Sequence, residues 1–391
     1  MNKLYETQSY LNNTATTVEE CVADGDRFRI RVKESIFFPE EGGQYADSGV
    51  ILYNGETYAL LDGQVIDGEI WYYVNQEIPA GEAIIQRLNW PLRYSRMQQH
   101  SGEHIVSGLI HNRFGLDNIG FHLSDDEPVT LTVNGKLDDE QIAIIERMAN
   151  DVVYMNLPIR DTYPTAEGIR NINYRSKKEI EGQIRLISIG EEGDEIDICA
   201  CCAPHVKRTG EIGIIKVISA MSYKGGTRIG ILCGKRALEY LVHEHDLLGQ
   251  IARGFSTSAD NIPRNIEGLY KEITDLKIRM AGLQEQLILR EIDAMPDGGV
   301  HCIFAGSDLE DSGMKAAYNM LSERFEGNVG VFKGDDPSGY QFYAGDKKGD
   351  STQLLKIMKE ELNAKAGGNA EMIRGFVSAD ADRIREIFGT A

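Results

Sequence analysis

The sequence predicts an α+β protein of several domains, and three observations lead to this. Short runs near the N-terminus alternate apolar and polar residues, as half-buried strands do. Residues 97–115 and 237–294 instead carry apolar residues at helical spacing. A chain of 391 residues with 42% hydrophobic composition can bury several cores. We therefore expect four domains or segments, at residues 1–90, 91–236, 237–294 and 295–391.

Residues 1–90 are expected to form a small β-barrel or sheet. "RFRIRV" at 27–32 alternates with period two, Asn54-Gly55 is a hairpin turn signal, and "EIWYYV" and "EAIIQRL" follow. Among these strands lies a loop, "FFPEEGGQYADSG", whose Gly42-Gly43 pair favours positive φ and lets backbone approach a ligand. A double glycine alone is more often a plain turn.

The composition indicates a cytoplasmic protein. The N-terminal residues lack the apolar stretch of a signal peptide, and no run of about 18 apolar residues occurs anywhere. Six cysteines, three of them crowded into residues 199–202, do not resemble a disulfide framework in a chain of this length. We expect metal ligands or buried thiols, and no membrane partner.

Residues 97–115 predict a helix that ends at Gly115 and carries a pair of histidines. His100 and His104 are four residues apart, so one helical face presents both imidazoles to a single ion. The pair alone also fits two surface histidines. It differs from the metalloprotease helix, which has glutamate directly after the first histidine, because the acid here is Glu103.

The stretch "ICACCAPHV" supplies the rest of a metal site. Cys201 and His205 form a CxxxH pair, and with the two helical histidines they give one thiolate and three imidazoles, a set suited to zinc. Cys199 and Cys202 compete with Cys201 for this role. Alternation along a strand would turn Cys199 and Cys201 to one face and Cys202 to the other.

Charge is unevenly distributed along this acidic chain. Residues 160–236 hold thirteen Lys/Arg and ten Asp/Glu, a local charge of +3, which leaves −23 for the rest of a chain whose net charge is −20. The basic residues flank the cysteine cluster and include Arg175, Lys177, Lys178, Lys207, Arg208, Lys224, Arg228, Lys235 and Arg236. This pattern fits a solvated surface of mixed sign or one basic face on an acidic body.

Residues 237–294 predict two helical stretches separated by "GFSTSADNIPRN". In the second stretch, apolar residues alternate spacings of three and four over about three heptads. This seam consists of Ile266, Leu269, Ile273, Leu276, Met280, Leu283 and Leu287. It can pair with the first helix as an antiparallel hairpin or with another subunit.

Residues 295–391 predict a small α/β domain. The expected strands are "VHCIFAG", "NVGVFKG", "YQFYAG" and "EMIRGFV", and the expected helices lie near 309–325, 351–364 and 379–388. Gly367-Gly368 is expected in a loop, with phosphate binding as the alternative.

These motifs in combination resemble the alanyl-tRNA editing domain and its free-standing relatives, the AlaX proteins. The resemblance rests on "HSGEH", on "CCAPHVKRTGEIGIIKV" about a hundred residues later, on the glycine-rich loop and on "YKGGTRIGILCG". The sequence departs from the family pattern at Glu41, where a glycine is usual, and at Cys202-Ala203-Pro204 between the ligands. Residues 295–391, with "NAKAGGNAEMIRGFV", resemble the C-terminal domain of alanyl-tRNA synthetase.

The resemblance implies a trans-acting, zinc-dependent hydrolase of the long AlaX type. We expect it to deacylate tRNA(Ala) mischarged with serine or glycine, with Gly43 and Gln44 lining the pocket. Zinc would either activate a water or anchor the substrate amine. Candidate tRNA contacts are Lys207, Arg208, Lys224 and Arg228.

The expected architecture is therefore a β-barrel-like domain, a zinc editing domain, a helical linker and a C-terminal α/β domain. We expect no aminoacylation domain and find no GxxxxGK[ST] phosphate-binding motif, so ATP-dependent activation is not expected. A homodimer through the C-terminal half is expected. Two alternatives remain: a threonyl-type editing hydrolase, and an inactive zinc-stabilised tRNA-binding protein.

Overall fold

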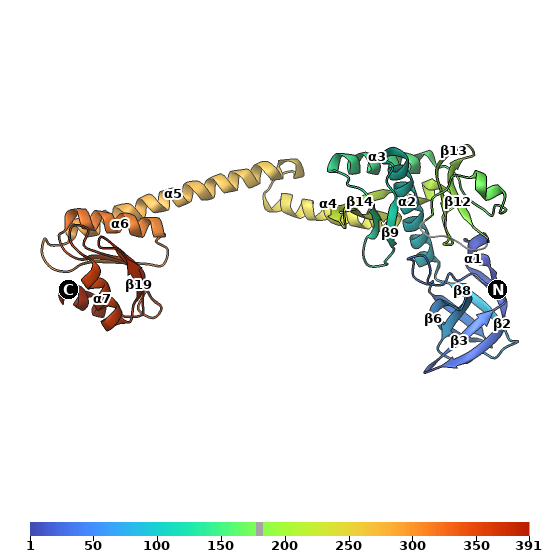
Figure 1. Cartoon of the computed structure of the whole chain (residues 1–391), viewed down its shortest axis with the longest axis horizontal. Helices are drawn as coiled ribbons and strands as arrows, with labels where there is room; N and C mark the ends of the chain where they lie inside the picture. Colours follow the sequence, from blue (N-terminus) through green and yellow to red (C-terminus); the bar gives the residue numbers. More distant parts are fainter. Residues whose placement is uncertain (177–182, 391) are drawn as a thin grey trace. The chain divides into compact units, whose positions relative to one another are not determined.

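The computed structural model describes residues 1–176 and 183–390, so the predicted basic residues Lys177 and Lys178 lie outside the described residues. The chain forms two compact units, Met1–Leu248 (unit 1) and Gly249–Ala391 (unit 2) (Figure 1). The predicted α+β class is confirmed. The boundary falls inside helix α4 (Gly234–Gly254), so the segment predicted as a helical linker is divided between the units; the finer division into four domains remains a prediction.

Unit 1 begins with a closed barrel of six antiparallel strands. In the order of pairing they are β2 (Asn13–Asp24), β3 (Arg27–Val32), β7 (Glu69–Val74), β6 (Glu56–Ile66), β5 (Gly49–Tyr53) and β8 (Ala83–Leu88). The predicted strands at 27–32 and 69–74 are confirmed. Asn54 and Gly55 take φ values of 49° and 79°, both positive as a two-residue hairpin turn of type I′ requires.

The rest of unit 1 packs two sheets around helices. One sheet has the order β14-β15-β10-β9 and the other β11-β12-β13. The strands are β9 (Asn118–His122), β10 (Val129–Val133), β11 (Ile159–Thr162), β12 (Leu186–Glu191), β13 (Asp194–Ala200), β14 (Ile215–Tyr223) and β15 (Gly226–Cys233). Helix α3 (Asp139–Met155) and the 3-10 turns η1 (Gly168–Asn171) and η2 (Thr209–Ile212) complete it. At the N-terminus, β1 (Asn2–Lys3) pairs with β4 (Glu34–Ser35) beside α1 (Leu4–Thr7).

Helix α2 (Trp90–Phe114) carries the predicted histidine pair through the centre of unit 1. It starts seven residues earlier than the apolar stripe indicates, with Pro91 in the first turn, and ends at Gly115 in the left-handed conformation, as predicted. All residues from 96 to 110 are buried, the polar ones included. Polar groups at these positions must therefore find partners inside the protein.

Unit 2 is a five-stranded sheet with helices on both faces, preceded by the long helix α5 (Ile262–Ala294) and the 3-10 turn η3 (Ala259–Asn261). The strand order is β16 (His301–Ala305), β17 (Val329–Asp335), β18 (Gly339–Gly345), β20 (Ile373–Val377) and β19 (Lys365–Gly368). The helices are α6 (Asp311–Arg324), α7 (Thr352–Leu362) and α8 (Ala381–Thr390). The predicted strands and helices of this segment are all present.

One prediction for unit 2 is wrong: Gly367 and Gly368 lie in the edge strand β19 rather than in a loop. A Cβ built on Gly368 would lie 2.2 Å from the carbonyl oxygen of Met372, so glycine permits the close approach of β19 to β20.

Helix α5 leaves its predicted heptad seam uncovered. All seven seam residues, from Ile266 to Leu287, are exposed. Ile288 and Ile292 near the C-terminal end of the helix pack into the core of unit 2, and Ile262 at its start is also buried. None of the helices in the described ranges is both long enough and apolar enough to cross a bilayer.

Candidate metal centre

The four predicted metal ligands converge on one point. His100 and His104 come from α2, and Cys201 and His205 from the loop after β13. Their candidate ligand atoms all lie within 4.8 Å of one another. The Sγ of Cys201 is 3.6 Å from Nε2 of His100 and 3.4 Å from Nε2 of His205. Ligands about 2.0–2.3 Å from a shared zinc at tetrahedral angles stand roughly 3.3–3.8 Å apart, so the residues present fit this ion.

Each histidine uses its other ring nitrogen to contact a different polar side chain. Nδ1 of His100 lies 2.8 Å from Oε1 of Gln44, and Nδ1 of His205 lies 3.0 Å from Oγ of Ser101. Nδ1 of His104 lies 3.2 Å from Oδ2 of Asp197. These contacts orient the rings and leave the Nε2 atoms facing one another, an arrangement usual for metal-binding histidines.

The electrostatics of the cluster favour a thiolate. Burial raises the pKa of Cys201, but His100 and His205 outweigh it and hold that pKa well below its ordinary value. Burial lowers the pKa of His205 to about 3. Burial also lowers the pKa of His104, but its hydrogen bonds to Asp197 and Cys201 outweigh this and raise it to about 9. A buried thiolate beside imidazoles is the form of cysteine that binds metal.

The predicted glycine loop is a tight turn that aims Gln44 at the cluster. Glu41 and Gln44 exchange backbone hydrogen bonds of 3.2 and 3.1 Å, and Gly42 and Gly43 between them take φ values of 64° and 86°. The carbonyl of Gly43 accepts a 3.0 Å hydrogen bond from the backbone N–H of Leu123, and a Cβ on Gly43 would lie 2.8 Å from the carbonyl oxygen of Phe121. The turn is thus fixed against β9, with the Gln44 side chain fully buried.

Gln44 retains an unused donor. If Nε2 of His100 binds metal, its Nδ1 carries the proton and must meet an acceptor, which identifies the contacting Gln44 atom as Oε1. The amide Nε2 of Gln44 is then buried with no hydrogen-bond partner among the described residues. A buried unpaired donor is costly, so this atom is available for a ligand.

The competing cysteines take other positions. Strand β13 ends at Ala200, so the alternation expected for Cys201 and Cys202 does not extend to them. Cys202 faces the glycine turn: burial, Cys201 and a hydrogen bond with Glu41 raise its pKa. The two departures from the family pattern therefore contact each other. Cys199 is buried and groups with His104 and Asp197 as a second candidate ligand set.

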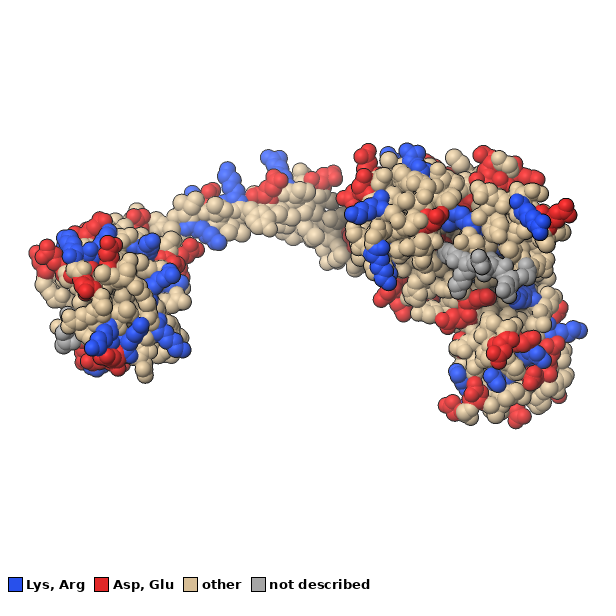
Figure 2. All heavy atoms as spheres, in the orientation of Figure 1, with Lys and Arg blue, Asp and Glu red and all other residues tan. Residues whose placement is uncertain are grey.

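The four predicted RNA-contacting residues lie in two separate places. Lys207 and Arg208 are exposed two and three residues after the predicted ligand His205. Lys224 and Arg228 belong to the hairpin of β14 and β15, where both contact the ring of Tyr223, Arg228 at 3.5 Å. Cys233, at the end of β15, lies against Gly102 of α2. Arg228 is five residues earlier on this strand, so its backbone lies about 17 Å from that contact with the histidine helix. Figure 2 shows lysine and arginine interspersed with acidic residues on the face it draws.

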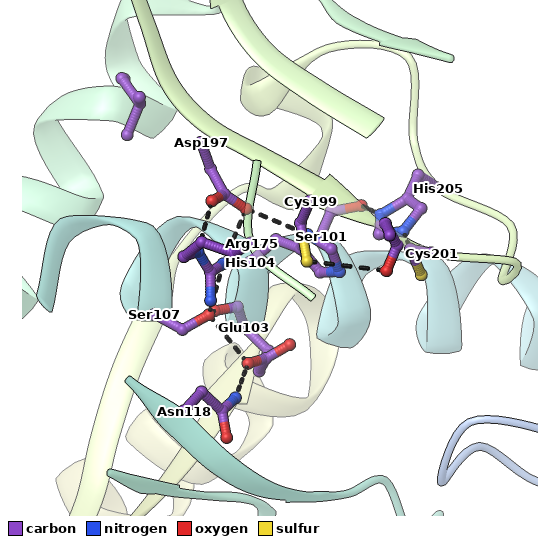
Figure 3. Close-up of polar contacts among 12 residues, drawn as sticks. Ser101, Glu103, His104, Ser107, Asn118, Arg175, Asp197, Cys199, Cys201 and His205 are labelled. Carbon is purple, nitrogen blue, oxygen red and sulfur yellow. Dashed lines mark hydrogen bonds and ion pairs between the residues drawn. The ribbon is translucent and has the colours of Figure 1, made fainter. Parts of the chain in front are cut away.

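Sequence reasoning missed the polar network behind His104 (Figure 3). Asp197 accepts hydrogen bonds from Arg175 as well as contacting His104, and Arg175 also donates to Ser107 of α2. A cavity of about 600 Å³ adjoins Arg175 and Asp197. One signal in the sequence pointed to such a network: residues 96–110 of α2 contain many polar residues beside the apolar stripe, and polar residues on a buried helix need partners.

Comparison with known proteins supports the resemblance seen in the motifs. Residues 184–230 match the family described as the threonyl and alanyl tRNA synthetase second additional domain. The chain is 27% identical over 404 aligned residues to the alanyl-tRNA editing protein AlaX-L of Pyrococcus horikoshii, covering 99% of this chain and 97% of that protein. The predicted resemblance to long alanyl-tRNA editing proteins is thus confirmed.

Alanine–tRNA ligases are also similar. The enzyme of Ignicoccus hospitalis is 28% identical over 282 residues, covering 70% of this chain and 31% of the ligase. That of Pyrobaculum arsenaticum is 27% identical over 361 residues, covering 89% of this chain and 40% of the ligase. The chain therefore spans less than half of these ligases, and their whole activity does not transfer to it.

Proposed function

We propose that this chain is a trans-acting aminoacyl-tRNA hydrolase that removes serine, and glycine, from mischarged tRNA(Ala). The observation that carries the proposal is the convergence of three imidazoles and one thiol beside the unpartnered Gln44 amide. Similarity to an alanyl-tRNA editing protein along 99% of the chain supports the choice of substrate. We expect the reaction to take place in the cytoplasm.

His100, His104, Cys201 and His205 are the residues that would hold a zinc ion. When bound, zinc supplies Lewis acidity and positive charge beside the ester. The chain contributes the fixed orientation of each imidazole through Gln44, Asp197 and Ser101. It also excludes bulk water, because the three histidines are almost fully buried.

Gln44 is proposed to bind the substrate through its amide Nε2. This donor is buried, unpaired and attached to a rigid turn, so it loses little entropy when it meets a substrate oxygen. An oriented donor aimed at an oxygen that gains charge during ester hydrolysis lowers the barrier. Gly43 contributes by allowing the turn to pack against β9.

Discrimination against alanine requires a polar group that pairs with the serine hydroxyl. A buried group of this kind is left unpaired when alanine binds, which disfavours that substrate strongly. A synthetase pocket that accepts alanine cannot reject serine strongly, because an apolar pocket disfavours an added hydroxyl only by about a hundredfold. A separate hydrolytic site supplies the missing selectivity.

The tRNA is proposed to contact Lys207, Arg208, Lys224 and Arg228. The first pair follows His205 and is suited to phosphates close to the reacting end. The second pair flanks Tyr223, which gives the hairpin a cationic and aromatic surface. Four contacts on an otherwise acidic protein imply moderate dependence of binding on salt.

A homodimer through the C-terminal half is also proposed. The heptad seam of α5 presents seven exposed apolar residues, which a parallel or antiparallel copy of the same helix would cover. The sheet and the other helices of unit 2 leave these seam residues exposed. We choose a second copy of this chain as the partner, because a heptad seam can pair with the same seam of another copy related by twofold symmetry.

The test is a deacylation assay on four substrates: Ser-tRNA(Ala), Gly-tRNA(Ala), Ala-tRNA(Ala) and Ser-tRNA(Thr). We expect hydrolysis of the first two, with the alanylated tRNA spared. Preference for Ser-tRNA(Thr) would indicate a threonyl-type editing enzyme instead. Binding of tRNA(Ala) without hydrolysis of any substrate would indicate an inactive RNA-binding protein.

A further inference from the structure

Arg175 is attached by its backbone to the strand that carries Asp197. Its N–H donates to the carbonyl of Ile198 at 2.8 Å, and its own carbonyl accepts from the N–H of Ala200 at 2.9 Å. Because these bonds fix the main chain of Arg175 beside β13, its guanidinium has a defined position relative to the metal ligands that follow this strand.

The guanidinium grips Asp197 with two parallel hydrogen bonds. Nε donates to Oδ1 at 2.7 Å and Nη2 donates to Oδ2 at 2.8 Å. The side chains are 14% and 2% exposed, so the pair is largely removed from water. Bidentate pairing fixes the plane of a carboxylate as well as its position.

Oδ2, one of the two gripped oxygens, is also the atom that contacts Nδ1 of His104 at 3.2 Å. Figure 3 shows Arg175 and His104 meeting this carboxylate together. The direction of the His104 ring therefore depends on a carboxylate whose own orientation Arg175 sets. Without the arginine, a buried Asp197 would lose its charge partner and would be free to rotate.

Arg175 also connects the strand to the helix that bears His104. Its Nη2 donates to Oγ of Ser107 at 3.1 Å, and Ser107 donates to Oε1 of Glu103 at 2.9 Å. Ser107 lies three residues after His104 on α2. One guanidinium thus holds both the partner of the ligand and the helix of the ligand.

We propose that Arg175 is a positioning residue of the metal centre, acting through Asp197 to orient Nε2 of His104 toward the ion. This inference deepens the proposed function, because it presupposes that the four-residue cluster binds zinc. A purely structural ion pair between Arg175 and Asp197 would differ in one respect: its loss would lower the stability of the protein without changing the metal environment.

The experiment measures metal binding in the full-length protein carrying Arg175→Met, Arg175→Lys, Asp197→Asn, or both Arg175→Met and Asp197→Asn. Zinc affinity comes from competition with a chromophoric chelator, and the environment of the ion from the visible spectrum of the cobalt-loaded protein. We expect Arg175→Met to weaken zinc binding about 10- to 100-fold, the usual effect of removing such a partner. Arg175→Lys, which restores a charge but not the fork, should recover part of the loss.

Two comparisons isolate the route through Asp197. If Arg175 acts through that carboxylate, the double variant should bind zinc no more weakly than Asp197→Asn alone. Arg175 lines the 600 Å³ cavity, so added guanidinium at millimolar concentration should enter the space left in Arg175→Met and restore affinity. Lys216→Met is the control, because it removes a partly exposed ion pair with Glu146 in unit 1 that touches no proposed ligand.

Zinc affinity and cobalt spectrum unchanged in Arg175→Met, with only the unfolding midpoint lowered, would make the pair purely structural and overturn the proposal. Additive losses in the double variant would also overturn it, because they place Arg175 on a separate route. A parent protein that binds no zinc would instead contradict the metal site itself, and the inference with it.

Discussion

In unit 1 polar side chains are buried where apolar ones are usual, whereas in unit 2 apolar side chains are exposed where polar ones are usual. The central helix of unit 1 hides histidines, glutamines, serines and a glutamate among its residues 96–110. The long helix of unit 2 exposes seven apolar seam residues. Both departures carry a cost in the isolated chain. Most of the buried polar groups of α2 are paired within unit 1, and the converging histidines with the unpaired Gln44 amide leave room for an ion and a substrate. For the exposed seam of unit 2 we infer a second chain.

The largest expected effect tests the buried side of this comparison. His104→Ala should reduce bound zinc from one ion per chain to none and abolish deacylation, because one of the four ligands and the link to Asp197 are lost. Elemental analysis of the purified protein measures the zinc. His111→Ala, on the same helix but only partly buried and outside the cluster, should retain both properties. Stoichiometric zinc in His104→Ala would contradict the ligand assignment.

The second effect tests the exposed side. Leu276→Lys together with Leu283→Lys should convert a dimer to a monomer, because both charges would enter one apolar seam. Sedimentation should show the dissociation constant raised by at least about 100-fold, or about 2.7 kcal/mol. Thr274→Lys with Glu285→Lys adds charge to the same helix outside the seam and should leave the assembly unchanged. A seam variant that stays dimeric places the interface elsewhere.

A third prediction separates two roles of Gln44. Gln44→Glu keeps an acceptor for Nδ1 of His100 but removes the amide donor, so zinc should remain while the rate of deacylation falls by roughly 100-fold. Gln44→Met removes both groups and should also weaken zinc binding. Parallel metal and rate measurements on the two variants decide the matter. An undiminished rate in Gln44→Glu would exclude the donor from catalysis.

The smallest effect concerns electrostatics. Three or four phosphate contacts imply that the logarithm of affinity falls with the logarithm of salt concentration with a slope near 3. Lys224→Asn should lower this slope by about 0.7–0.9. Asparagine is chosen because residue 224 has a φ of 47°, which asparagine tolerates well. Lys356→Gln, on α7 of unit 2, is the control and should leave the slope unchanged. If this variant lowers the slope as much as Lys224→Asn does, the RNA-binding surface includes unit 2.

Much of the fold was predictable because its signals are local. Alternation in "RFRIRV" and the apolar run "EIWYYV" predicted strands with the observed bounds, and the Asn54-Gly55 turn joins the expected hairpin. Edge strand β19 was missed because its glycines read as a loop, while their actual role depends on the neighbouring strand. The closure of the barrel by pairing β2 with β8 depends on residues far apart in sequence.

The site divides in the same way. Helical spacing and the CxxxH pair sufficed to select the four residues that converge. The partners that orient them could not be predicted, because Asp197, Ser101 and Arg175 have no spacing that marks them and meet the histidines only through tertiary packing. Gln44 was predicted to line the pocket, but its contact with His100 emerges only from the turn that buries it.

The closed barrel also bears on the order in which the chain acquires structure during synthesis. Every strand of the ring lies between Asn13 and Leu88, so closing the ring requires no strand from later in the chain. Helix α2 begins at Trp90, immediately after the closing strand, and its Arg93 is held by Asp47 and by the carbonyl of Ile36. The barrel thus provides a finished platform from which the two histidines extend while Cys201 and His205, about a hundred residues later, are still to be translated.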